Sequence, residues 1–187
     1  MALTDSGWLI PAQAVSVTTA GRAAWADAAN VITATGYATS STEVFASSAQ
    51  LTEPLRVTDF SITVPAANVI VGIEVKLDGW SGNQSMSDAE LFLVHNGSRI
   101  SGNKLASHVL YSPDSAWVTH THGGAADTFG ITISNTTAED ATFGFEVATI
   151  NDSTTPYFHW ARTLRMKVYY DTPSAATSVP TTIGIIG

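Results

Sequence analysis

Apolar and polar residues alternate through much of the middle of the chain. The longest alternation covers residues 71–77, where Val71, Ile73, Val75 and Leu77 are separated by a glycine and two charged residues. A period of two places the apolar side chains on one face of a β-strand and the polar ones on the other. Shorter runs of the same kind predict further strands at 60–64, 89–93, 129–133, 143–147 and 164–170.

Turn-forming residues lie between these runs. Asn96-Gly97 is a pair that favours a two-residue type I′ hairpin, because both positions need a positive φ. Residues 23–30 also fit a helix by propensity, although the residues after them fit a strand, so both alternatives stay open. Short strands separated by turn signals are typical of a β-sandwich or barrel. We therefore expect an all-β fold with about eight antiparallel strands.

The composition supports an all-β chain and excludes several classes of function. Only 13% of the 187 residues are charged, with 8 Lys+Arg against 16 Asp+Glu, and Ser and Thr supply about a quarter of the chain. Thr is β-branched and suits a pleated strand. A chain with net charge −8 is a poor partner for nucleic acid. With no cysteine, disulfides and Cys-based zinc sites are excluded.

Two further expectations concern the membrane and the site of synthesis. No apolar run approaches the roughly 20 residues that span a bilayer, so we expect no membrane partner. The first residues carry neither the basic cluster nor the apolar stretch of a secretory signal, so we expect synthesis in a cytoplasm.

The two ends of the chain differ from its middle. They lack a clean period and are apolar, uncharged and interrupted by proline, whereas a solvated tail is normally polar. We expect an N-terminal arm at 1–21, a single sandwich domain at 22–171 and a C-terminal arm at 172–187, with the arms lying on a neighbouring subunit. The alternative is that each end packs on its own domain. The expected anchors of the arms are Trp8, Leu9, Ile10 and Pro11 at one end and Ile183, Ile185 and Ile186 at the other.

A set of short motifs between residues 25 and 170 carries a resemblance to a known group of proteins. In their order and spacing they resemble the jelly-roll β-sandwich structural proteins that are common in tailed-bacteriophage genomes. The motifs include Ile62-Thr63-Val64-Pro65, Ile70-Val71-Gly72-Ile73, Gly123-Gly124-Ala125-Ala126-Asp127, Phe143-Gly144-Phe145 and Met166-Lys167-Val168-Tyr169-Tyr170.

The resemblance implies a jelly roll and a non-enzymatic role in the virion, without a cofactor. The first expectation is a capsid decoration, or cement, protein that staples subunits of the major capsid protein on the capsid exterior, as a homotrimer made in the host cytoplasm. The alternative is a head-fibre, tail or baseplate component that binds a host-surface glycan.

Exposed aromatic residues bear on the glycan alternative. Residues of this kind in loops could form a platform on which a sugar ring stacks. Trp160, however, has the parity of Leu164 and Met166 along the chain and is expected in the core. The platform candidates are Trp80, Trp117, Tyr157, Phe158 and Trp160.

A second, weaker alternative is a cupin-like metal enzyme. On a strand, His120 and His122 would share one face about 7 Å apart, with Asp127 five residues further on. This resembles the opening of the metal motif in cupins, which are also jelly rolls. The match ends there, because the expected preceding glycine is Asp114 and no later segment supplies a third histidine in a fitting turn. We expect the two imidazoles to be polar surface groups or to line a subunit contact.

Other catalytic patterns are weaker still. The sequence has no Gly-x-Ser-x-Gly elbow and no phosphate-binding glycine-rich loop with its Lys and Ser/Thr. Asp88 and Glu90 form a carboxylate pair by their spacing, but glycosidase chemistry needs two acids positioned across a cleft. We therefore expect no catalytic residues and no resident metal.

Overall fold

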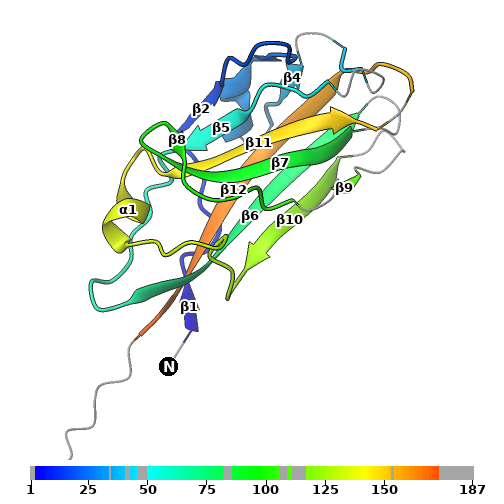
Figure 1. Cartoon of the computed structure of the whole chain (residues 1–187). Helices are drawn as coiled ribbons and strands as arrows, with labels where there is room; N and C mark the ends of the chain where they lie inside the picture. Colours follow the sequence, from blue (N-terminus) through cyan, green and yellow to red (C-terminus); the bar gives the residue numbers. More distant parts are fainter. Residues whose placement is uncertain are drawn as a thin grey trace, which may run out of the picture.

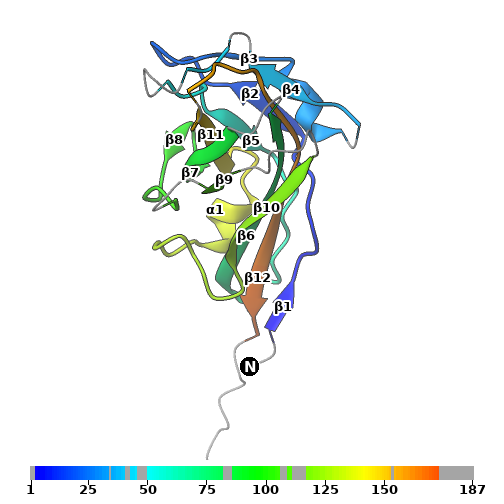
Figure 2. The same ribbon diagram turned by 90° about the vertical axis from the view of Figure 1, so that its right-hand side faces the viewer.

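The protein folds as a two-layer antiparallel β-sandwich, as expected for a jelly roll (Figure 1). The computed structural model describes residues 3–33, 35–40, 43–45, 50–81, 86–105, 109–110, 117–152 and 154–172. Seen edge-on, the two sheets face each other across a common core (Figure 2). The all-β jelly-roll prediction is confirmed.

Sheet A contains the two longest strands of the described chain, side by side at its centre. Strand β12 pairs with β6 along most of its length, and β1 pairs with the last residues of β12. The order is β10 (Val118–Gly124), β6 (Val69–Ser81), β12 (His159–Asp171), β4 (Ala38–Ser40) and β3 (Trp25–Ala26), with β1 (Leu3–Asp5) beside the far end of β12.

Sheet B forms the opposite layer and is centred on β11. A short β9 also pairs with β7. The order is β2 (Gln13–Ser16), β5 (Leu55–Thr58), β11 (Gly144–Asn151), β7 (Met86–His95) and β8 (Ser98–Arg99), with β9 (Val109–Leu110) off this path. The described helical elements are a 3₁₀ turn (Ala28–Ile32) and the five-residue helix α1 (Asn135–Glu139), which Ser134 caps by accepting from the Thr137 N–H.

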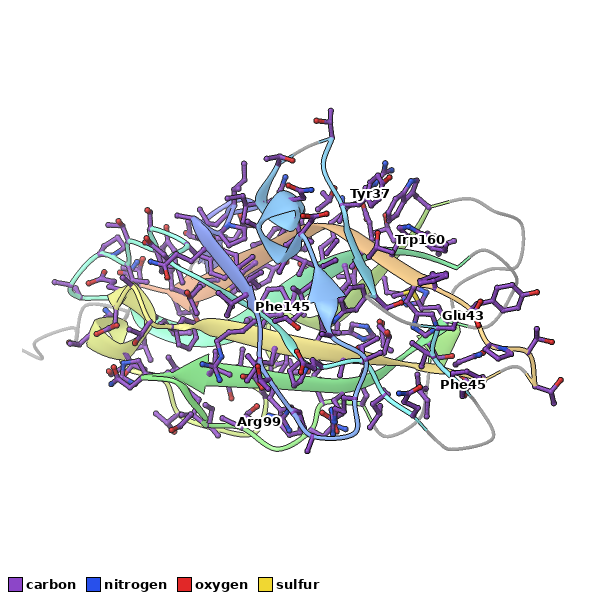
Figure 3. All side chains as sticks on the ribbon, turned by 90° about the horizontal axis from the view of Figure 1, so that it is seen from above. Tyr37, Glu43, Phe45, Arg99, Phe145 and Trp160 are labelled. Carbon is purple, nitrogen blue, oxygen red and sulfur yellow. The ribbon has the colours of Figure 1, made fainter. Side chains whose placement is uncertain are left out.

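The core lies between the two sheets and consists of aliphatic and aromatic side chains. Phe145 of β11 stacks on Phe60, with ring centroids 5.8 Å apart, and Figure 3 shows Phe145 between the layers. Burial of rings of this size dominates the stability of a core. The largest fully buried side chains include Phe143, Phe145, Leu55, Ile73, Leu77, Leu91, Leu93, Leu164 and Met166.

The hairpin prediction is confirmed, and two predicted strands are wrong. Asn96 and Gly97 have φ values of 50° and 74° and join β7 to β8. Residues 60–64 and 129–133 form no ladder, although their apolar residues are buried or, at Ile131, partly buried. Positive φ values at Ser61 (50°) and Phe129 (57°) interrupt the extended backbone there. In these segments the alternation reflects burial without strand pairing.

Residues 23–30, which fit a helix by propensity, form a short strand and most of a 3₁₀ turn. Trp25 and Ala26 form the short strand β3, and the 3₁₀ turn follows at once. The indole N–H of Trp25 donates to the carbonyl of Glu53 at 2.8 Å, which satisfies the one polar group of a buried ring. Of the residues after 30 that fitted a strand, Val31 and Ile32 end this turn, whereas Ala38–Ser40 form strand β4.

The N-terminal residues belong to the sandwich. Strand β4 pairs with the first part of β12 only, and β1 covers the edge of β12 beyond it. Ser6 donates its N–H to the Val168 carbonyl and accepts the Val168 N–H on its hydroxyl, both at 3.0 Å. Strand β2 then pairs with β5 in the other sheet. Residues 3–21 are therefore part of the domain and form no separate arm, because an unpaired edge of β12 would leave backbone groups unsatisfied.

Two findings concern the chain beyond these strands. Ile183, Ile185 and Ile186, the expected anchors of the C-terminal arm, lie outside the described residues. Across the described ranges, no helix is both long and apolar enough to cross a membrane.

Candidate functional sites

Most of the exposed large apolar side chains of the described residues fall into two groups toward opposite ends of β12. Leu3 and Val69 both lie beside Asp171, the last residue of the strand, whereas Phe158 comes just before its first residue. Thirteen extended residues span roughly 40 Å. The first group is Leu3, Trp8, Ile10 and Val69, and the second is Tyr37, Phe45 and Phe158. Val15 belongs to neither group, because it lies on β2 in sheet B.

We call the exposed apolar residues of the N-terminal segment, Leu3, Trp8, Ile10 and Val15, the N-terminal surface. The segment passes from sheet A, where Trp8 lies, to the outer face of sheet B, where Val15 lies. Trp8 is 38% exposed and Ile10 is 55% exposed. The other two predicted anchors lie elsewhere, because Leu9 packs against the core and Pro11 is buried. The four neighbouring anchors are therefore split by the fold, and two of them remain available to a partner.

Trp8 is held on the outer face of sheet A by two lysines. The Lys167 and Lys76 ammonium groups lie 4.6 and 5.9 Å from the centre of the indole ring. Beside them, the Tyr169 hydroxyl donates to Glu74 at 2.7 Å, and this bond raises the pKa of Tyr169 to about 12. Cation–π contacts and this network fix the ring in one orientation while leaving part of it exposed.

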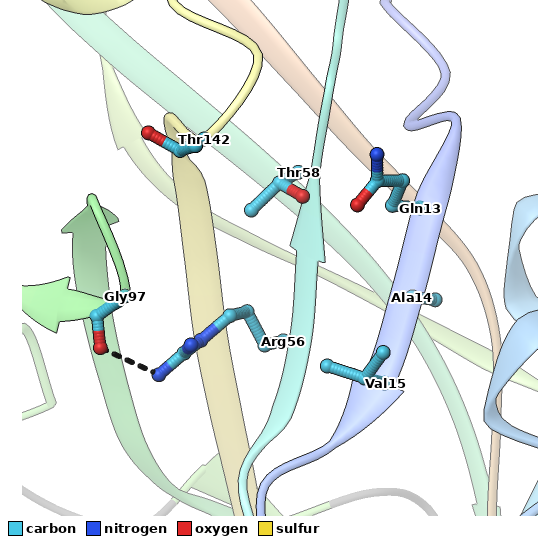
Figure 4. Close-up of a pocket in the computed structure, with 7 residues that line it drawn as sticks. All are labelled: Gln13, Ala14, Val15, Arg56, Thr58, Gly97 and Thr142. Atoms are coloured by element: carbon cyan, nitrogen blue, oxygen red, sulfur yellow. Dashed lines mark hydrogen bonds between the residues drawn. The ribbon is translucent and has the colours of Figure 1, made fainter.

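A hollow of about 200 Å³ on the outer face of sheet B adjoins the same segment (Figure 4). Arg56 projects into it from β5 and donates to the Gly97 carbonyl at 3.0 Å, and the exposed Val15 lies at its edge. A second hollow, of about 310 Å³, shares Arg56 and Gly97 with the first and continues toward Arg22 and Arg99. The lining of the first hollow is Gln13, Ala14, Val15, Arg56, Thr58, Gly97 and Thr142.

The floor of the second hollow is a network of three arginines and two glutamates. Arg22 binds Glu90 through two bonds of 2.8 and 2.9 Å, and Arg99 bridges Glu90 at 3.1 Å and Glu146 at 2.7 Å. Arg56 also binds Glu146, at 2.7 Å. The bidentate bond from Arg22 is the main cause of a lowered pKa at Glu90. The network fixes its side chains and leaves one excess positive charge on an otherwise acidic chain.

The second group of exposed residues belongs to what we call the aromatic end, formed by Tyr37, Trp117, Phe158 and Trp160. Tyr37 lies 6.1 Å from Trp117 and Phe158 lies 6.3 Å from Trp160, measured between ring centroids. The Arg162 guanidinium stacks on Trp117 at 4.2 Å. Figure 3 shows Tyr37 and Trp160 at the same end of the molecule.

The prediction that Trp160 belongs to the core is wrong. The register of β12 against β6 shifts between Arg162 and Arg165, where Thr163 has a φ of 54°. An irregularity of this kind moves the side chains on one side of it to the other face of the sheet. Trp160 is therefore half-buried on the outer face, while Leu164 lies in the core.

The other platform candidates are placed as follows. Trp117 and Phe158 lie with Trp160 at the aromatic end, and Tyr157 pairs through its backbone with Val44. The side chain of Trp80 lies outside the described part of the structure.

Between the sheets, two histidines converge on one buried carboxylate, and we call this group the histidine cluster. His120 Nδ1 lies 3.0 Å and His122 Nε2 lies 2.8 Å from the same Oδ2 atom of Asp88. The histidines come from β10 in sheet A, where they are paired with the core residues Leu77 and Val75, and Asp88 comes from β7 in sheet B. The cluster thus spans the gap between the layers.

A β-bulge turns Asp88 toward the interior. In the β7–β11 ladder, Glu90 lies opposite Ala148 and Asp88 lies opposite Thr149, so Ala89 is an extra residue on β7. The bulge separates the predicted carboxylate pair: Glu90 reaches the arginine network on the outer face, and Asp88 is fully buried. Spacing along the sequence predicts the same face for both residues and gives no sign of this bulge.

The carboxylate that the sequence paired with the two histidines was therefore the wrong one. Asp127 forms an ion pair with Lys104 and accepts the Phe129 N–H at 2.9 Å. Partial burial raises its pKa, but these two partners outweigh that effect and the pKa is lowered overall. Asp127 is thus paired with Lys104, and Asp88 is the carboxylate that contacts the two histidines.

A third histidine, His159, is buried next to this region. Its Nδ1 lies 2.8 Å from the Thr149 hydroxyl, and Thr149 is the register partner of Asp88. Burial lowers the pKa of His159 to about 3, against an opposing effect of the Asp152 charge. The ring is therefore neutral at physiological pH.

Comparisons with known proteins give the chain no family. No family model and no curated protein sequence matches it. Among solved structures it is similar to one described as "CBM4 structure and function", with 11% identity and a TM-score of 0.39, over 86% of this chain and 93% of that chain. A similarity of that size carries no argument about function, so the proposals below rest on the chain's own residues.

Proposed function

We propose that this protein is a non-enzymatic structural component of a tailed-phage particle, a decoration protein that binds the major capsid protein on the outside of the capsid. The observation that carries the proposal is the N-terminal surface. Within the described chain, residues 3–15 supply four of the eight exposed large apolar side chains. Exposed apolar side chains that one segment carries over two faces of the sandwich favour contact with another protein.

The neighbouring strand adds two features that suit protein binding. Strand β2 ends the strand order of sheet B, so an extended segment of a partner can pair with its outer edge. The hollow beside Val15 offers Arg56 and hydroxyl groups to a side chain of that partner. Together with the resemblance of residues 25–170 to phage jelly rolls, these features support attachment through this side of the molecule.

The proposed mechanism is mechanical. Each copy, within a homotrimer, joins adjacent capsid subunits, and the second and third contacts form at high effective concentration once the first is made. Because the protein binds the assembled lattice in preference to free subunits, binding stabilises the shell by mass action. The aromatic end, at the far end of β12, would then point away from the attachment surface.

The experiment measures binding of the purified protein to particles of its own phage that lack it. Trp8→Ala and Phe158→Ala form a matched pair, because both rings are 38% exposed but lie at opposite ends of the molecule. Loss of a tryptophan anchor from an interface weakens binding about 30-fold or more. We expect that loss for Trp8→Ala, no change for Phe158→Ala, and hundreds of copies per particle. Equal binding by both variants would reject the proposal.

A second candidate function is recognition of a host-surface glycan by a tail or fibre component. It is favoured by the aromatic end, where the exposed Tyr37 and Phe158 adjoin the Arg162–Trp117 stack. Aromatic rings combine an apolar face with polar neighbours in the way that a sugar ring requires. In the same set of variants, this candidate predicts the reverse result: Phe158→Ala loses binding to host polysaccharide, and Trp8→Ala keeps it.

A further inference from the structure

We propose that the histidine cluster binds one divalent transition-metal ion, with zinc the best fit. The ligands are His120 Nδ1, His122 Nε2 and the carboxylate of Asp88. These three donor atoms all lie within 4.8 Å of one another. Two imidazoles and one carboxylate form a donor set that suits zinc and neighbouring metals, whereas calcium and magnesium prefer oxygen ligands.

The spacing of the donor atoms matches a coordination shell. Two ligands bound at about 2.1 Å in tetrahedral or octahedral geometry are about 3.0–3.4 Å apart. The Asp88 oxygen lies 3.0 Å from His120 Nδ1 and 2.8 Å from His122 Nε2. The two rings meet edge to face, at 84°, so their nitrogens approach the carboxylate from different directions. The three donor atoms are thus close enough to share one ion.

The backbone directs each ligand to this point. The histidines are two residues apart on one strand and so share a face, as the sequence predicts, and the bulge at Ala89 turns Asp88 to meet them. The nearby alternative carboxylate, Asp127, is bound by Lys104. Of these two carboxylates, Asp88 is therefore the one that faces the histidines and can bind the ion.

Access and protonation are both compatible with binding. The His120 and His122 side chains keep 10% and 11% exposure at the edge strand β10, so an ion can reach them from solvent. An imidazole coordinates a metal through one ring nitrogen, here the one that faces Asp88, while its other nitrogen carries a proton. Binding then replaces the His120–Asp88 and His122–Asp88 contacts with bonds from all three side chains to the metal.

The consequence is a link between the two sheets. His120 and His122 belong to sheet A and Asp88 to sheet B, so one ion ties the edge of the first layer to the second. The chain has no cysteine and cannot use a disulfide for this purpose. A metal that binds the folded chain alone contributes its binding free energy to folding. We assign the ion a structural role.

The test uses the full-length chain without a histidine tag, freed of metal with a chelator. Zinc is titrated by calorimetry, and the thermal midpoint is followed with increasing free zinc. We expect one ion per chain and, at free zinc 100 times the Kd, a midpoint higher by about 5–10 °C. Cobalt(II) should give the visible absorption of a site with nitrogen and oxygen ligands. A wild-type chain that takes up less than 0.1 ion, or shows no shift, would overturn the proposal.

Variants separate this site from unspecific binding. His122→Ala and Asp88→Asn should lose both the stoichiometric ion and the shift, whereas Asp127→Asn and His95→Ala should keep them. His122 is the better first variant, because its side chain is partly exposed and, after its removal, His120 still contacts the buried Asp88 carboxylate. If His122→Ala retained the same affinity and shift as the Asp127→Asn control, the proposed ligand set would be wrong.

Discussion

His159 is a buried base that folding keeps neutral. No side chain or backbone group within the described structure forms a hydrogen bond with its Nε2, and burial lowers the pKa to about 3. A histidine in an unfolded chain has a pKa of about 6.5. Between these two values the unfolded chain binds a proton that the folded chain does not, so the stabilisation is complete above pH 6.5 and is lost as the pH falls toward 3.

We therefore predict that His159→Gln flattens the acid side of the stability profile. Between pH 6.5 and pH 4, the wild type should lose up to about 1.4 kcal/mol per pH unit more than the variant. Urea unfolding at several pH values measures this difference, and the other histidines contribute equally to both proteins. Parallel profiles for the two proteins would show that His159 titrates normally in the folded state.

The strands show where sequence patterns succeed and where they fail. The alternation at 71–77 predicts β6, because Ile73, Val75 and Leu77 on one face of that strand all meet the core. The same reasoning fails beyond the bulge at Ala89 and the irregularity at Thr163, where one residue out of register exchanges the two faces. The two histidines of the weaker, cupin-like alternative therefore contact Asp88 and not Asp127, and Trp160 was assigned to the wrong side.

Close contact between strands explains the glycine in one of the motifs that carry the resemblance to phage jelly rolls. The motif Phe143-Gly144-Phe145 places Gly144 against β5, where a Cβ atom would lie 1.9 Å from the Val57 carbonyl oxygen. Because this neighbour is backbone within a sheet, it cannot move aside. Gly72 is similar, because a Cβ atom there would meet the backbone of Gly124 and Ala125.

We predict that Gly144→Ala destabilises the fold by about 3 kcal/mol, the upper range for overpacking, and lowers the thermal midpoint by about 6–12 °C. The matched control is Gly102→Ala, because a Cβ there meets nothing within 4 Å. Its effect should stay within about 0.5 kcal/mol. Circular dichroism melts of the three proteins give the comparison, and equal midpoints for both variants would contradict the close approach.

At the scale of the whole molecule, the N-terminal segment closes one side of the sandwich and also carries its exposed apolar surface. Strand β1 pairs with β12 of sheet A and β2 with β5 of sheet B, so residues 3–16 join the two layers. Composition suggested an arm, because the segment lacks a clean period. The sequence pattern has no clean period here because the segment changes sheets within a few residues and presents a different face to each.

This dual role gives the last prediction, which concerns removal of residues 1–12. The deletion takes away β1, the packing of Leu9 and both backbone bonds between Leu9 and Met166, at 2.7 and 3.2 Å. Partial burial of one leucine and several hydrogen bonds together contribute about 3–5 kcal/mol. We expect the deletion to lower the free energy of unfolding by that amount, whereas Leu3→Ser, at a residue 54% exposed, should change it by less than about 0.5 kcal/mol. Denaturant unfolding measures both, and a deletion as stable as the full chain would mean that these residues behave as an independent arm after all.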